Sequence, residues 1–185
     1  PRIADDYRDL ANRIFVNQGE FNLNLLGSFG EENEHSRRNS CVQALCGKQY
    51  FGVVQKAIVR EALEKAEGIR KQRNCSDGEA IKSVFLAHSE MEWIRVYEKL
   101  WYVLNSGALQ EGKKKIQPGK INILELGADD IATGEILAEL VLSYFWRICY
   151  YAKTKSSTGR LILVLDEFQH CSLKYQAILP RLLTE

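Results

Sequence analysis

The sequence has little proline and almost no net charge. Its three prolines among 185 residues disfavour a turn-rich all-β fold and favour long helices. Lysine and arginine number 25 against 24 aspartates and glutamates, so the formal net charge is +1. This balance argues against a strongly basic nucleic-acid module and against an acidic tail. Hydrophobic residues make up 45% of the chain, which is typical of one ordinary globular domain.

The sequence also lacks a long apolar run. The longest apolar stretch, about residues 136–151, is interrupted by Glu139 and Arg147, so it is too short and too charged to span a bilayer. Acidic and basic residues within the first ten positions interrupt any early apolar segment, and no signal peptide is predicted. We therefore expect a cytoplasmic protein without an integral membrane segment.

Cysteine pairs with metal-binding spacing are absent. The five cysteines form no C-x-x-C pair, and the three histidines have no ligand spacing relative to them. This pattern disfavours a zinc site and favours reduced, mostly buried thiols, as in intracellular proteins.

Apolar spacing predicts a helix-rich chain with two strands. Apolar residues recur three and four positions apart in the helical segments, whereas the strands are short apolar runs. The expected helices span 4–16, 41–45, 53–66, 77 onward, 91–104, 131–153 and 172 onward. The expected strands span 121–126 and 161–165, and irregular or polar segments are expected at 21–30, 31–38, 70–76 and 112–120. Gly68 is predicted to end the helix over 53–66, and Asp77 to cap the next one.

The C-terminal elements follow the order strand, long helix, strand. This order is a βαβ unit, which predicts a parallel sheet with a right-handed crossover. The region from about 40 to 107 is nearly all helical and reads as an insertion. The fold class expected is therefore α/β and helix-rich overall.

The strongest chemical signal is the apolar run 161–165 followed by Asp166 and Glu167. A buried strand would deliver both carboxylates to its carboxyl end, where ligands bind in open parallel sheets. This is the Walker B pattern of nucleoside triphosphatases. Asp166 would hold Mg²⁺, and Glu167 would polarise the water that attacks the γ-phosphate. Gln169 and His170 follow closely and are candidates to contact the nucleotide phosphate or to orient that water.

The phosphate loop G-x-x-x-x-G-K-[ST] has only a near match in this chain. Gly107, Gly112 and Lys113 have the spacing, but Lys114 occupies the place of the Ser or Thr. The predicted context is also wrong, because a phosphate loop follows a strand and opens a helix. We interpret the match as accidental and expect the true phosphate loop on the N-terminal side of Pro1.

Several segments resemble the FtsK–HerA superfamily of P-loop ATPases, a group that includes DNA-pumping motors and conjugation or type IV secretion ATPases. The resembling segments are 6–11, Phe21-Asn22, the helical stretch 40–107, the strand over 121–126, Asp166-Glu167-Phe168-Gln169 and 179–185. The apolar run with Asp166 and Glu167 is the most specific of them.

The resemblance implies a partial RecA-like P-loop core, with parallel strands 121–126 and 161–165 and a large helical insertion. It divides the chain into an N-terminal part of the core (1–39), the insertion (40–110) and a core βαβ unit (111–185). It further implies ATP and Mg²⁺ as cofactors of the full-length protein, a homo-oligomeric ring such as a hexamer, and DNA or secretion-system components as partners. The 185-residue chain alone is expected not to hydrolyse ATP.

Other interpretations compete with this one. The chain would alternatively be a non-enzymatic helical interaction or adaptor module with a small sheet, or a nucleotide-binding remnant without activity. The basic clusters at 70–73 and 113–115 would contact DNA phosphates or form solvated loops. Trp93, Tyr97, Trp101 and Tyr102 would stack on bases or, as their helical spacing favours, pack in the core.

Overall fold

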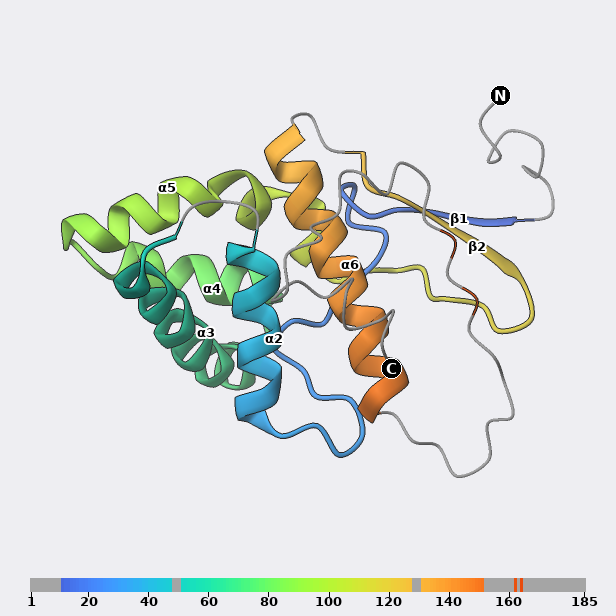
Figure 1. The fold of residues 1–185 in the computed structure, drawn as a ribbon, viewed down its shortest axis with the longest axis horizontal. Helices are drawn as coiled ribbons and strands as arrows, with labels where there is room; N and C mark the ends of the chain where they lie inside the picture. The colour runs from blue at the N-terminus through green and yellow to red at the C-terminus, as the bar shows by residue number, and fades with distance from the viewer. Residues whose placement is uncertain (1–10, 48–50, 128–130, 152–161, 163, 165–185) are drawn as a thin grey trace.

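A computed structural model describes residues 11–47, 51–127, 131–151, 162 and 164, and Figure 1 shows its fold. The described part is helix-rich α/β, as expected. Its elements are β1 (Ala11–Phe15), α2 (Glu34–Cys46), α3 (Val53–Arg73), α4 (Asp77–Leu86), α5 (Met91–Asn105), the short 3-10 helix η1 (Gly107–Leu109), β2 (Ile121–Glu125) and α6 (Ile131–Tyr151).

The two described strands pair in parallel. Ala11 lies opposite Ile121, and Phe15 lies opposite Glu125. The strand β2 confirms the prediction over 121–126. The predicted helix over 4–16 is wrong at Ala11–Phe15, because Ile14 and Val16 alternate into the core with no exposed surface. That period of two is the pattern of a strand with one buried face. The residues 4–10 lie outside the described part.

The predicted helices over 41–45, 53–66 and 91–104 are confirmed in α2, α3 and α5, with shifted ends. The predicted helix over 131–153 is confirmed in α6 as far as Tyr151, and residues 152 and 153 lie outside the described part. The polar segment 31–38 is not all loop, because α2 begins at Glu34 after Asn33 accepts a hydrogen bond from the amide of Ser36. Gly68 does not end α3. The helix continues to Arg73, so most of the predicted connector at 70–76 is helical, and Asn74 closes it in a left-handed conformation (φ 49°).

The start of α4 differs by one residue from the prediction. Ser76, not Asp77, is the N-cap, and its hydroxyl accepts from the amide of Glu79. The Glu79 carboxylate in turn accepts from the Ser76 amide (3.0 Å), which completes a capping box. Asp77 is left free to turn inward, where it is fully buried.

The helix α6 lies between the sheet and the other helices. Figure 1 shows α2 beside α6, with α3, α4 and α5 beyond it and the two strands on the opposite side. One continuous apolar core joins these layers; it includes Ile14, Leu45, Leu63, Leu100 and Leu137. Among the described helices, none combines the length and apolar character needed to cross a membrane.

The aromatic residues of α5 divide between two faces of the helix. Trp93 is buried and meets Phe85 edge to face (5.7 Å between ring centroids), as core packing requires. Trp101 and Tyr102, by contrast, are exposed. The prediction that helical spacing places this set in the core is therefore confirmed for Trp93 and wrong for Trp101 and Tyr102.

Candidate functional site

The four residues predicted to carry the chemistry lie outside the described part of the chain. They are Asp166, Glu167, Gln169 and His170, together with most of the apolar run that precedes them. Within that run only Ile162 and Val164 are described. Both are exposed and neither belongs to a strand, so a strand covered on both faces is not found at these two positions.

The described part of the predicted nucleotide region is the carboxyl edge of the two-stranded sheet. Because β1 and β2 are parallel, the segments that leave them meet at this edge. The Asn17 side chain donates to the carbonyl of Gly127 (2.8 Å), and the Val16 amide donates to the carbonyl of Glu125 (2.8 Å). Gly127 has a positive φ of 59°, which turns the chain from β2 toward α6. Hydrogen bonds within the chain therefore join the described segments that leave β1 and β2 at this edge.

The near match to a phosphate loop has a structural explanation. Gly107 opens η1, and its amide donates to the carbonyl of Asn17 (2.8 Å). A Cβ at this position would lie 2.2 Å from the amide nitrogen of Gly19, so only glycine fits. A Cβ at Gly112 would likewise lie 2.3 Å from the amide nitrogen of Asn22. Both glycines allow close backbone approach.

The chain after these glycines also lacks the geometry of a phosphate loop. The segment that follows Gly112 leads through an irregular loop into β2, not into a helix. This loop therefore does not open a helix whose N-terminal amides would face a phosphate, as a phosphate loop does. The interpretation of Gly107–Lys113 as an accidental match agrees with this geometry.

A buried ion pair links α6 to the segment that follows β1. Arg147, which is 1% exposed, donates through Nε to Glu32 Oε1 (2.8 Å) and through a terminal nitrogen to Glu32 Oε2 (2.9 Å). It also donates to the carbonyls of Asn24 (3.0 Å) and Gly27, and its guanidinium lies 4.8 Å from the ring centroid of Phe29. This single side chain fixes the irregular segment 24–32 against α6. Sequence reasoning missed that role, although a charge within an apolar helix is the signal that would have indicated it.

A second buried cluster joins α2 to α3. Arg37 pairs with Glu67 at 2.8 Å, and Arg38 Nε donates to the other carboxylate oxygen of Glu67 at 2.9 Å. Burial alone would raise the pKa of Glu67, but the hydrogen bonds from Arg38 and Arg37 outweigh it and lower that pKa below its ordinary value. Glu67 therefore stays charged, and its ion pairs hold α2 against α3.

Asp77 occupies a third buried position. Its carboxylate pairs with Arg70 Nε (2.9 Å) and accepts from the amide of Leu26 (3.3 Å). Burial raises the pKa of Asp77 despite the opposing effect of Arg70. Each partner of Asp77 thus ties α4 to a neighbouring segment, and the geometry is that of a structural contact.

The basic clusters are partly taken up by such contacts. Arg70 lies in the last turn of α3 and faces Asp77. Lys114 Nζ contacts Glu20 (2.8 Å) and the carbonyl of Arg13 (2.9 Å). Lys113 and Lys115 beside it are exposed. The basic loop therefore presents fewer available charges than its sequence indicates.

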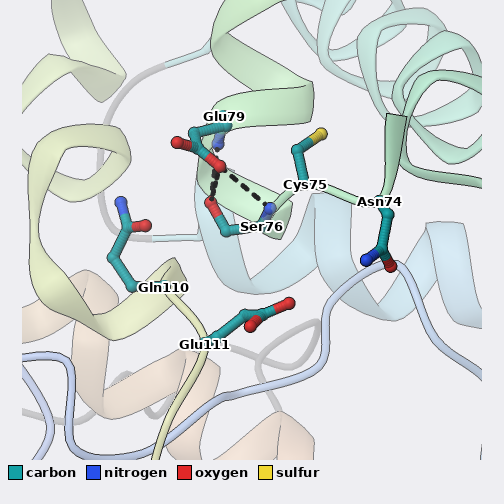
Figure 2. A pocket seen from close by; sticks show the side chains of 6 residues that line it. All are labelled: Asn74, Cys75, Ser76, Glu79, Gln110 and Glu111. Atoms are coloured by element: carbon teal, nitrogen blue, oxygen red, sulfur yellow. Dashed lines mark hydrogen bonds between the residues drawn. The ribbon is translucent and has the colours of Figure 1, made fainter. Parts of the chain in front are cut away.

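A polar hollow of about 390 Å³ lies where the α3–α4 connection faces the segment after η1 (Figure 2). Its lining residues are Asn74, Cys75, Ser76, Glu79, Gln110 and Glu111. The Glu79 carboxylate accepts from the amide and the hydroxyl of Ser76 (3.0 and 2.9 Å), and these bonds lower its pKa. Glu79 is thus occupied in the capping box.

Of the four cysteines in the described part of the chain, two are buried as predicted and two are not. Cys41 and Cys46 are buried, and burial raises their pKa values to about 11 and about 12. Thiols with such pKa values are poor nucleophiles at neutral pH. Cys75 is partly exposed and Cys149 is exposed, and both are free. Over the described residues, no group of three or more histidines, cysteines and acidic residues is placed to hold a metal ion.

Comparison with known proteins does not assign the chain to a family. No family model, no curated protein and no solved structure matches the chain significantly.

Proposed function

We propose that this chain is part of an ATP-hydrolysing motor of the DNA-translocase or secretion-ATPase type. The observation that carries the proposal is the apolar run 161–165 followed by Asp166 and Glu167, placed directly after β2 and α6. The parallel pairing of β2 with β1 supports it, because P-loop ATPase cores are built on parallel sheets.

The roles in the proposed site follow from the chemistry of the side chains. A carboxylate is the ligand that Mg²⁺ prefers, so Asp166 would hold the ion that accompanies ATP. Glu167 would accept a proton from the attacking water, and Gln169 and His170 would contact the phosphate or orient that water. Bound Mg²⁺ would neutralise charge that develops on the phosphates. The chain contains no G-x-x-x-x-G-K-[ST] segment, so the proposal requires a phosphate loop from outside these 185 residues.

The further parts of the proposal rest on the resemblance to the FtsK–HerA superfamily. The full-length protein would assemble as a homo-oligomeric ring, such as a hexamer, in the cytoplasm. Its partners would be DNA or components of a secretion system. The near-neutral charge of the chain is compatible with such a motor when the basic groups of the ring are concentrated on a few loops.

A helical interaction module is the second candidate function. The observation that favours it is the exposed aromatic surface on α5, where Trp101 and Tyr102 lie on the outside of the helical layer. Such a module needs no nucleotide chemistry. An ATP hydrolysis assay therefore distinguishes the two candidate functions.

The test compares ATP turnover in the protein encoded by the complete reading frame with turnover in two variants. Glu167→Gln removes the proposed base, and we expect turnover to fall by about 100-fold or more. Glu61→Gln makes the same chemical change at an exposed position of α3, away from the α5 surface, and is expected to leave turnover unchanged. Equal turnover in the two variants, or no turnover in the unmodified protein, would reject the motor and favour the interaction module.

A further inference from the structure

The outward side of α5 carries a set of apolar and charged side chains that no described element covers. This α5 outer face consists of Met91, Ile94, Arg95, Glu98, Trp101 and Tyr102, all of them exposed. Their spacing of three and four residues places them on one side of the helix, opposite the buried Trp93, Val96 and Leu100. Figure 1 shows α5 at the outer edge of the helical layer.

The composition of the α5 outer face is that of an interaction surface. Trp101 is 45% exposed and Tyr102 62%, and the two rings meet edge to face at 5.0 Å between centroids. Met91 is 61% exposed and Ile94 38%. Tryptophan and tyrosine are the residues most enriched at binding hot spots, and a helix face that gathers four large apolar side chains is costly to leave in water.

The order of these residues along α5 makes the face self-complementary. Met91 and Ile94 lie in the first half of the helix, Trp101 and Tyr102 in the second half, and the charges of Arg95 and Glu98 lie between them. A two-fold axis that passes beside α5, level with the midpoint between Arg95 and Glu98, places the first half of one α5 against the second half of the other. The smaller apolar side chains then face the aromatic ones, and each Arg95 comes near the Glu98 of the other copy.

We infer that the α5 outer face binds the α5 outer face of a second copy of this chain, in an antiparallel pair. The charge pattern favours a second copy as the partner, because the face carries one basic and one acidic group at its centre and therefore complements itself. Antiparallel alignment also places opposite ends of the two helix dipoles side by side. The contact is isologous, so it differs from the head-to-tail contacts that build a ring and does not depend on the proposed motor.

The size of the face sets the expected strength of the pair. A helix of 15 residues is about 22 Å long, and a contact through one face of it is smaller than the roughly 1,600 Å² buried in a standard stable interface. We therefore expect a reversible dimer with a dissociation constant in the micromolar range.

In the Arg95–Glu92 pair (2.6 Å) both side chains are about half exposed, so Arg95 exchanges partners at little cost.

The test is sedimentation equilibrium of the chain over about 1 to 500 µM, a range that brackets a micromolar constant, with circular dichroism to confirm that each variant is folded. The unmodified chain should show a monomer–dimer equilibrium. Trp101→Ala should weaken the dimer by about 10-fold or more, the effect of losing one hot-spot residue. Tyr150→Ala is the matched control, because Tyr150 is a similarly exposed aromatic residue (49%) on α6, and it should leave the dimer unchanged.

Charge reversal tests the antiparallel geometry. Arg95→Glu and Glu98→Arg should each weaken the dimer by placing like charges together, and the double variant should restore it. A chain that stays monomeric over the whole range overturns the inference and leaves the face to a different protein. An assembly that survives Trp101→Ala, or a double variant as weak as its parents, overturns it as well.

Discussion

The helical layer and the sheet of this protein hold their charges in different ways. Arg147 and Glu32 are almost fully buried and bond to each other and to nearby backbone, whereas Arg13 and Glu125, which pair across β1 and β2, are each about a quarter exposed. The strand β2 also has no fully buried residue. Strands of parallel sheets are normally covered on both faces. From this difference we expect the contacts of the helices to contribute more to stability than those of the sheet, which is the more open of the two described regions.

Removing one arginine from each region should give the largest difference in the free energy of unfolding between the two regions. Arg147→Met leaves Glu32 charged and buried without its arginine, and only the Phe29 amide (3.2 Å) still donates to its carboxylate, so we expect the free energy of unfolding to fall by about 3–5 kcal/mol. Arg13→Met removes the cross-strand pair, which is about a quarter exposed, and should cost about 1 kcal/mol or less. Urea unfolding followed by circular dichroism measures both. Equal losses in the two variants would contradict the contrast between the regions.

A pair of glycine substitutions should give the next largest effect. Gly107→Ala drives a methyl group into the backbone of residues 17–19 and should lower the free energy of unfolding by about 1–3 kcal/mol. Gly68→Ala lies inside α3 with open space around it, so the same chemical change should raise the free energy of unfolding by about 0.5–1 kcal/mol. Opposite signs in thermal or urea unfolding support the close approach of η1 to the segment after β1. A neutral Gly107→Ala would refute that approach.

The smallest expected effect is a dependence of stability on pH that arises in the helical layer. The pKa of Glu67 is lower in the folded chain than its ordinary value of 4.5, so its contribution to stability is present above pH 4.5 and is lost as the pH falls through the lowered value. Glu67→Gln should therefore flatten the stability curve below pH 4.5. Glu61→Gln, on an exposed position of the same helix, should leave the slope unchanged. If both variants keep the slope of the unmodified chain, Glu67 is not its source.

Sequence patterns predicted the elements that depend on local spacing. The apolar periodicity over 53–66, 91–104 and 131–153 was sufficient because long amphipathic helices bury one face wherever they lie. The strand at Ala11–Phe15 was not predictable in this way, since its partner is more than a hundred residues away. The same holds for Arg147 and Glu32, whose pairing depends on tertiary contact. For the candidate site, the pattern around Asp166 and Glu167 remains a prediction from sequence.

The most direct test of the proposed chemistry is the identity of the nucleotide that stays bound to the Glu167→Gln variant of the protein encoded by the complete reading frame. The variant is incubated with Mg²⁺ and ATP for many turnover times of the unmodified protein, and the bound nucleotide is then separated and identified. If Glu167 polarises the attacking water, the variant should retain ATP, because binding persists while hydrolysis is slowed by about 100-fold or more. Recovery of ADP in the same proportion as from the unmodified protein would contradict the assignment.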